Sequence, residues 1–190
     1  MLFKTVIADP PWSYDNKVGP QASPSHRPNS WDKTGTASSS QRYGEMSLQD
    51  IKALPVADLT ESRGSHLYLW TTNSMIVEAH EVARAWGFEP KTVITWVKTR
   101  HTDGEPSMKM GFYYRSATEH CLFAVRGRLR LSGPARPTAF FHPRLAHSEK
   151  PTTIHEWAEE QSPRPRLELF ARREREGWAC FGSALETWPW

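Results

Sequence analysis

The chain lacks the features of secreted, membrane-spanning and disulfide-stabilised proteins. Its only two cysteines, Cys121 and Cys180, are far apart and outside any CxxC spacing. We therefore expect neither a disulfide framework nor a cysteine-ligated zinc site, and a reducing compartment is the default. No apolar run approaches the roughly 18 residues needed to cross a bilayer, and the amino terminus lacks the pattern of a secretory signal. These absences predict a cytoplasmic protein without a membrane partner.

Internal repeats and a strong excess of one charge are also lacking. A length of 190 residues, with 38% hydrophobic and 24% charged residues, favours a single globular domain over residues 1–190. The net charge of +3 is too small to indicate a nucleic-acid partner. However, residues 126–150 contain six Arg or Lys residues and one acid. This stretch predicts a local positive patch, with a solvated basic loop as the alternative.

Metal-ligand spacing is absent among the eight histidines. The segment HEVAR, residues 80–84, begins like the zinc motif HExxH, but Arg84 replaces the second histidine. We therefore expect no metal site. Tryptophan, in contrast, is abundant: nine are present, and Trp12 and Trp31 lie in loop-like surroundings where exposed rings suit stacking on a flat ligand.

Hydrophobic periodicity and breaker residues predict about seven strands interleaved with a few helices. The predicted strands cover residues 4–8, 66–72, 91–98, 119–127, 137–142, 166–172 and 178–182. The predicted helices are one capped by Ser47 and ending near residue 54, one capped by Asn73 or Ser74 and ended by Gly87, and one over 152–161. This alternation predicts an α/β sheet with helices on both faces. Residues 13–45 and 99–118 are irregular and are expected to be long functional loops.

The segment VIADPPWSY, residues 6–14, places an acid, two prolines and two aromatic residues directly after an apolar run. Ligands of open α/β sheets bind beyond the carboxyl ends of strands, where Asp9 is expected. The prolines fix the backbone, and Pro11 has no N–H that could compete for the Pro10 carbonyl. We therefore predict two acceptors in one cleft, the Asp9 carboxylate and the Pro10 carbonyl, with Trp12 beside them. A simple turn is the alternative.

Two acceptors beside an aromatic face suit an exocyclic amino group on a flat heterocycle such as adenine. Two hydrogen bonds from that amine would localise its lone pair on nitrogen. The nitrogen could then attack a methyl group on a sulfonium in line, without a covalent enzyme intermediate. Catalysis would consist mostly of positioning and electrostatic stabilisation, with Asp9 favouring the positive charge that builds on nitrogen.

A second strand end supplies a candidate cofactor site. The segment RLELFARRE, residues 166–174, places Glu168 and Phe170 at the end of a strand before a charged turn. No Gly-rich turn follows, so the segment is weak as a nucleotide motif. Lys150, near a predicted helix start, is suited to binding a carboxylate. An ordinary helix entry is the alternative for the segment AHSEKP around it.

Five segments in this order resemble the MT-A family of adenine-N6 methyltransferases: IADPPW, TWVKT (95–99), EHCLFAVRG (119–127), HSEKP (147–151) and SPRPRLELFARRE (162–174). The family includes the messenger-RNA adenosine methyltransferase subunit and phage and bacterial DNA enzymes. The resemblance implies a Rossmann-like class I methyltransferase fold with a mostly parallel sheet. That fold is circularly permuted, so that the catalytic motif precedes the cofactor-binding strand.

The resemblance also implies roles for individual residues, with S-adenosyl-L-methionine as the cofactor. The catalytic motif would be Asp9, Pro10, Pro11 and Trp12. The expected cofactor contacts are Ala8, Asp9, Lys150, Leu169, Phe170, Arg172, Glu174 and Ser183, where the serine stands in place of an amide residue of relatives. The expected substrate contacts are Trp12, Tyr14, Lys98, Tyr113, Glu119 and His147. Trp31 and Tyr114 are further candidates for stacking in the loops 13–45 and 99–118, which correspond to substrate-facing loops.

Three functional interpretations follow. The first is an active enzyme that methylates adenine in nucleic acid, with DNA favoured over RNA and a short or relaxed target sequence. The second is a catalytically silent nucleic-acid-binding subunit, which loss of Asp9 or Lys150 would mark; both are present, which favours activity. The third is methylation of a cytosine or a small-molecule amine. A homodimer and a separate partner subunit are both compatible with the sequence.

Overall fold

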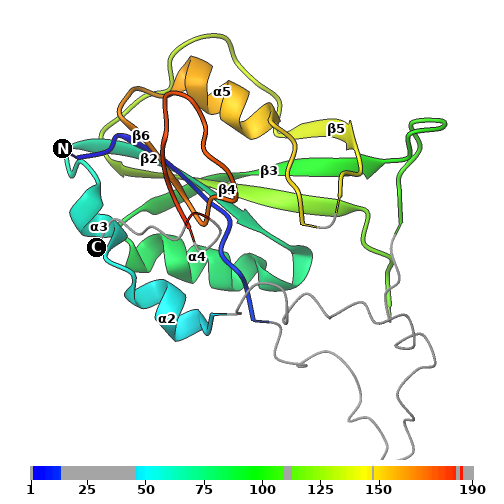
Figure 1. The fold of residues 1–190 in the computed structure, drawn as a ribbon, viewed down its shortest axis with the longest axis horizontal. Coiled ribbons are helices and arrows are strands. Elements are labelled where there is room, and N and C mark those ends of the chain that lie inside the picture. Colours follow the sequence, from blue (N-terminus) through cyan, green and yellow to red (C-terminus); the bar gives the residue numbers. More distant parts are fainter. Residues whose placement is uncertain (1, 14–45, 109–112, 147, 183–184, 186–190) are drawn as a thin grey trace, which may run out of the picture.

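The computed structural model describes residues 2–13, 46–108, 113–146, 148–182 and 185. Its centre is one seven-stranded sheet with the strand order β5-β3-β4-β2-β1-β6-β7 (Figure 1). The strands are β1 (Thr5–Ala8), β2 (Gly64–Thr71), β3 (Glu89–Thr99), β4 (Thr118–Gly127), β5 (Ala139–Pro143), β6 (Arg166–Leu169) and β7 (Ala179–Phe181). All seven predicted strands are confirmed.

The sheet is mostly parallel. Strands β7, β6, β1 and β2 run parallel to one another, and so do β3 and β5. Only β4 is antiparallel to both of its neighbours, β2 and β3. Such a mixed α/β sheet is consistent with the Rossmann-like methyltransferase fold that the sequence predicted.

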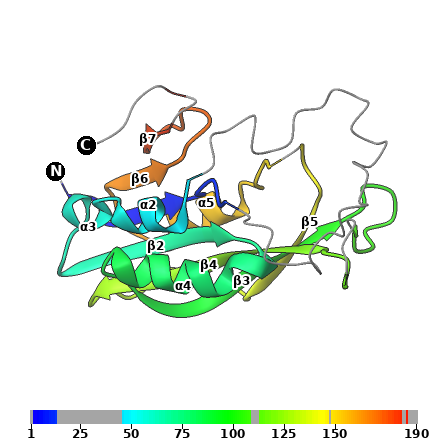
Figure 2. The ribbon, with the colours of Figure 1, turned by 90° about the horizontal axis from the view of Figure 1, so that it is seen from below.

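Helices cover both faces of the sheet, as expected (Figures 1 and 2). One face carries α2 (Leu48–Ala53), α3 (Val56–Leu59) and α4 (Ile76–Ala85), and the other carries α5 (Thr153–Gln161). The short helix α3 was not predicted, because four residues are too few to show a helical period.

The predicted cap of α2 is confirmed, whereas that of α4 is wrong. The Ser47 side chain accepts a hydrogen bond from the Asp50 N–H, which satisfies one of the free amides of the first turn of α2. Residues Asn73–Met75 form a 3₁₀ turn, and no side chain caps α4, which begins at Ile76. Gly87 does end this helix, with a φ of 81° that suits glycine.

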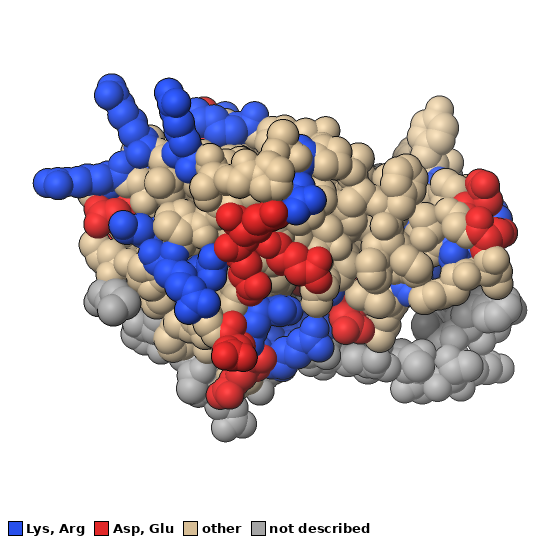
Figure 3. Space-filling model, turned by 90° about the horizontal axis from the view of Figure 1, so that it is seen from above, with Lys and Arg blue, Asp and Glu red and all other residues tan. Residues whose placement is uncertain are grey.

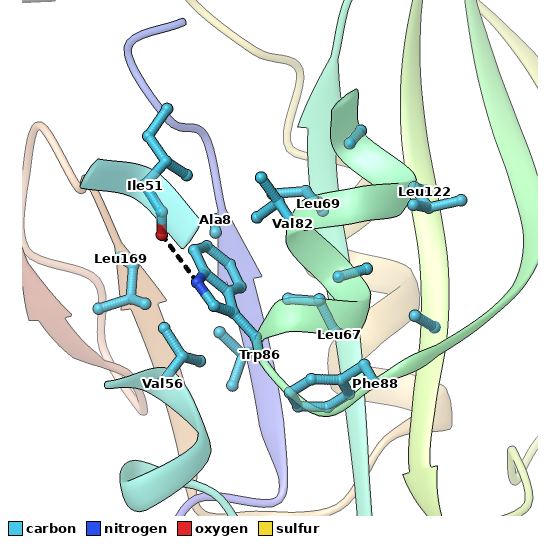
Figure 4. Close-up of a cluster of buried hydrophobic side chains, with 14 of the residues drawn as sticks. Ala8, Ile51, Val56, Leu67, Leu69, Val82, Trp86, Phe88, Leu122 and Leu169 are labelled. Atoms are coloured by element: carbon cyan, nitrogen blue, oxygen red, sulfur yellow. Dashed lines mark hydrogen bonds between the residues drawn. The ribbon is translucent and has the colours of Figure 1, made fainter. Parts of the chain in front are cut away.

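A hydrophobic cluster lies between the sheet and the helices α2, α3 and α4 (Figure 4). Trp86, at the end of α4, is fully buried, and its indole N–H donates to the Ile51 carbonyl of α2 over 2.9 Å. A second cluster, which includes Tyr68, Trp70, Trp96 and Ile154, lies under α5. Because both faces are covered, the central strands β1 and β2 are buried along their whole length rather than alternating in exposure.

Candidate active site

The strand register brings side chains at matching positions at the carboxyl ends of β1, β2 and β6 to one edge of the sheet. Ala8 of β1 pairs with Leu69 of β2 and with Leu169 of β6. The next residue along each strand is Asp9, Trp70 and Phe170, respectively. Because side chains alternate between faces, Asp9 and Trp70 point to the α5 side, away from the Ala8 side chain in the core under α4. The site therefore lies at the carboxyl edge of the parallel strands, on the α5 face.

Two lysines and two carboxylates form a charged cluster at this edge, in which positive and negative groups alternate. Lys150 Nζ lies 2.8 Å from Asp9 Oδ2 and 3.4 Å from Glu119 Oε2. Lys98 Nζ donates to the other carboxylate oxygen of Glu119, Oε1. Since β4 is antiparallel, its amino end carries Glu119 to the edge where β1 carries Asp9. This charged cluster thus connects Asp9 after β1 with Glu119 of β4 through Lys150, and Glu119 with Lys98 of β3.

Burial and ion pairing act against each other in this cluster. Burial raises the pKa of Glu119, but Lys150 and Lys98 outweigh it, so that the pKa of this carboxyl lies below its usual value. Burial lowers the pKa of Lys150, but Asp9 and Glu119 outweigh it and raise the pKa of this ammonium group. Glu119 and Lys150 are therefore held in their charged forms by their partners.

The backbone of the DPPW segment differs from the prediction at one point. The Trp12 N–H donates to the Pro10 carbonyl over 2.9 Å, so this carbonyl is not free of competitors. The prediction considered Pro11 alone, whereas the donor comes from one residue further on. A carbonyl oxygen has a second lone pair, so Pro10 retains capacity for one more hydrogen bond. The Pro11 carbonyl accepts from the Met46 N–H over 3.0 Å, which anchors the segment to the start of α2.

The expectation that Trp12 is an exposed stacking residue is wrong. Its side chain is only 5% exposed and belongs to the hydrophobic cluster under α4. Its indole N–H donates to the Trp70 carbonyl of β2 over 3.0 Å. Trp12 thus packs the DPPW segment onto the neighbouring strand, and the aromatic ring that faces the site is that of Trp70. Lys150 Nζ lies 5.6 Å from the centre of that ring.

A cleft of about 290 Å³ opens beside Asp9 and Lys150. This volume is at the lower end for small-molecule sites. Its other lining residues are Ile7, Trp70, Ala146, Ser148, Glu149, His155, Glu168, Leu169, Phe170, Arg172, Arg173 and Arg175. Ser148 and Phe170 have φ angles of 61° and 64°, which residues other than glycine adopt at a cost in free energy. Both strained residues line this cleft.

One group in the cleft was not anticipated from the sequence. His155 Nε2 lies 2.9 Å from Glu168 Oε2, and Arg175 Nε lies 3.7 Å from the same oxygen. The His155 ring packs edge-on against Trp178, with 5.2 Å between the ring centres. Helix α5 buries Ile154, His155, Ala158 and Gln161. A titratable residue on this side of the helix was the available signal for His155.

The residues that line the cleft are chemically suited to S-adenosylmethionine. Arginine and lysine suit its carboxylate, and a carboxylate such as Glu168 suits ribose hydroxyls. Phe170 and Trp70 offer aromatic surface for the adenine ring. Among the predicted contacts, Asp9, Lys150, Leu169, Phe170 and Arg172 line the cleft. The buried side chain of Ala8 and the exposed Glu174 are not part of this lining. Ser183 lies outside the described residues.

The predicted substrate contacts fall into three groups. Lys98 and Glu119 lie in the charged cluster, and Lys98 is only 7% exposed. Tyr113 and Tyr114 are 77% and 96% exposed on the segment that leads into β4. Tyr14, Trp31 and His147 lie outside the described residues.

The basic stretch 126–150 does not form the single positive patch that was predicted. Arg126 donates to the Ala57 and Thr60 carbonyls, and Arg136 pairs with Glu160. Arg128 and Arg130 follow the end of β4, at the edge opposite to Asp9, because β4 runs antiparallel to its neighbours. Figure 3 shows Lys and Arg side chains in separate groups with acidic side chains between them. The antiparallel strand β4 therefore divides the stretch between two edges.

The family comparison agrees with this geometry. Residues 3–184 match the model of the family described as MT-A70. The chain belongs to the MT-A70 family. Of its relatives, the type II methyltransferase M.MunI of Mycoplasma sp is 30% identical over 187 residues, which are 95% of this chain and 76% of that protein.

Two further relatives are longer proteins. The human N(6)-adenosine-methyltransferase catalytic subunit METTL3 is 24% identical over 97% of this chain and 28% of its own length. The Arabidopsis thaliana N6-adenosine-methyltransferase non-catalytic subunit MTB is 24% identical over 68% of this chain and 15% of its own length. This MT-A70 chain therefore spans about a quarter or less of these two relatives, and three quarters of the Mycoplasma protein.

No three His, Cys, Asp or Glu side chains of the described part gather as metal ligands do. In the same part of the chain, no helix has the length and apolar character that crossing a membrane requires.

Proposed function

We propose that this MT-A70 chain is an S-adenosylmethionine-dependent methyltransferase that methylates the N6 amino group of adenine in nucleic acid. The observation that carries the proposal is the ion pair of Asp9 with Lys150 in the lining of a cleft whose residues suit that cofactor. The whole reaction would take place within one domain, residues 1–190, of a cytoplasmic protein.

In this mechanism, bound S-adenosylmethionine supplies a methyl group that is electrophilic because it is attached to a sulfonium. Asp9 and the remaining lone pair of the Pro10 carbonyl accept hydrogen bonds from the target amine. These bonds orient the nitrogen and favour the positive charge that develops on it. Lys150 pairs with Asp9 Oδ2 and leaves Oδ1 as the candidate acceptor. Arg172 and Arg173 also line the cleft and suit the carboxylate of the cofactor.

DNA is favoured over RNA as the substrate. The support is the type II methyltransferase of Mycoplasma sp, of which the chain covers a larger share than of the METTL3 proteins. If the substrate is a duplex, the target adenine must leave the base stack, at a cost of a few kcal/mol. The alternative of a silent subunit has a relative in MTB, which is named non-catalytic. The ion-paired Asp9 favours an active chain, alone or as a homodimer or with a partner subunit.

The test is methyl transfer from labelled S-adenosylmethionine to unmethylated DNA and RNA, with Asp9→Ala beside the wild type. The products are digested to nucleosides and identified by mass. The proposal predicts N6-methyladenine that disappears with Asp9→Ala. Methyl groups on cytosine would contradict the adenine assignment. Retained cofactor binding without transfer to either polymer would favour the silent subunit or a missing partner.

A further inference from the structure

Arg144, at the edge of the sheet that carries the site, has two guanidinium nitrogens that are unpaired among the described residues. Its Nε and Nη2 atoms are buried and have no hydrogen-bond partner in the described part of the chain. Buried polar groups, and charged ones above all, are nearly always paired, because desolvation without a partner costs free energy. Two of the three guanidinium nitrogens thus lack a partner in the described part of the chain, and an anion from outside the chain would supply one.

The backbone around Arg144 is held in place. Arg144 follows β5 directly, and its N–H donates to the Thr99 carbonyl at the end of β3 over 3.1 Å. The His101 ring nitrogen Nε2 lies 2.9 Å from the Arg144 carbonyl oxygen. Strands β3 and β5 are parallel and end side by side, so both contacts lie at the edge that also carries Asp9 (Figure 1). The side chain thus starts from a fixed position rather than from a free loop.

Two acids of this edge, Glu119 and Asp103, have other partners among the described residues. Glu119 is paired with Lys98 and Lys150, and Asp103 is paired with Arg100 over 2.7 Å. Arg144 is also not among the residues that line the cofactor cleft, whereas Ala146 and Lys150 are. An anion at Arg144 therefore belongs to the substrate side of Asp9, beyond Lys98, rather than to the carboxylate of the cofactor.

We propose that Arg144 binds a backbone phosphate of the nucleic acid beside the target adenine. A guanidinium matches a phosphodiester with two parallel N–H donors, which fix position without reading sequence. This inference rests on the proposed function, since it requires a nucleic-acid substrate. It also explains why a buried charge is kept without a partner: the cost in stability is offset when the phosphate binds.

The experiment compares Arg144→Ala and Arg144→Lys with the wild type in binding of a fluorescent duplex over a range of salt concentrations. We expect Arg144→Ala to weaken binding about tenfold to a hundredfold and to lower the slope of log K against log salt by about 0.9. Arg144→Lys should restore only part of the affinity, because it lacks the planar fork. Arg130→Ala is the matched control, exposed and at the opposite edge, and should change little.

Two readouts separate this role from a structural one. Removing an unpaired buried charge should leave the thermal midpoint unchanged or raise it, whereas a structural arginine would lower it. Replacing single phosphates of the duplex by neutral methylphosphonates should weaken wild-type binding at one position. The same replacement should leave the binding of the Arg144→Ala variant unchanged. A lowered midpoint, or unchanged duplex binding and salt slope, would overturn this inference alone. A wild-type chain that binds no nucleic acid would overturn the proposed function with it.

Discussion

Lys150 Nζ lies 2.8 Å from Asp9 Oδ2, although the two residues are 141 positions apart in the chain. The sequence predicted a catalytic role for the acid and a cofactor contact for the lysine. The ion pair makes them one unit, which also includes Glu119. A ligand that engages either residue therefore changes the electrostatic environment of the other.

Replacing Lys150 tests how strongly Asp9 and Glu119 depend on this lysine. Lys150→Met leaves the Asp9 carboxylate without its cation and Glu119 with Lys98 alone. We expect a loss of about 3 kcal/mol in the free energy of unfolding and loss of methyl transfer, measured by urea unfolding and by product mass. The double variant Lys150→Met/Asp9→Asn should recover part of the stability, because it removes the stranded charge of Asp9. Equal stability of the wild type and the single variant would contradict the prediction.

Trp12→Phe tests the buried role of this tryptophan. The variant keeps a ring in the core but leaves the Trp70 carbonyl without its donor, which should cost about 1–3 kcal/mol of stability. We expect a lower kcat and an almost unchanged KM for nucleic acid, because the ring does not face the substrate. Steady-state kinetics and thermal unfolding give both quantities. A KM that rises several-fold at unchanged stability would favour direct stacking instead.

Tyr114 is the opposite case, since its side chain is 96% exposed. If it stacks on a base, Tyr114→Ala should weaken nucleic-acid binding by about 1–3 kcal/mol, while Tyr114→Phe should retain most of the affinity. The thermal midpoint should not change, because no buried contact is lost. Fluorescence anisotropy with a labelled oligonucleotide measures the effect. Equal affinities of the alanine and phenylalanine variants would argue against stacking.

Stability should fall as the solution is acidified, in part because of His66. Burial lowers the pKa of His66, which a hydrogen bond with the Leu129 carbonyl offsets only partly. The unfolded chain therefore takes up the proton first, and the free energy of unfolding falls as the pH drops through the ordinary value of 6.5. It levels off below the folded pKa. Urea unfolding between pH 8 and pH 5, in roughly half-unit steps, measures this slope.

His66→Gln is the control for this pH dependence, and it should reduce the slope without abolishing it. Burial also lowers the pKa of His120, so that this residue contributes in the same direction. A slope that survives unchanged in His66→Gln would show that another group is responsible.

The sequence determined the elements and the motifs, because both depend on neighbouring residues. Strand periodicity, the Ser47 cap, Gly87 and the prolines after Ala8 act over a few positions, and the structure retains each of them. The motif order pointed to the family in the same local way. The placement of Asp9 at a strand end is likewise a consequence of the residues beside it.

Only the tertiary structure decided which of these residues meet. The antiparallel insertion of β4 carries Glu119 to the edge of Asp9 and divides the basic stretch 126–150 between two edges. Trp12 turned out to be buried because β2, 58 residues further along the chain, supplies the carbonyl that accepts from it. Strand order and pairing arise from contacts that close over such long separations. A local pattern shows that a side chain is apolar or charged, whereas the packed sheet decides which partner it finds.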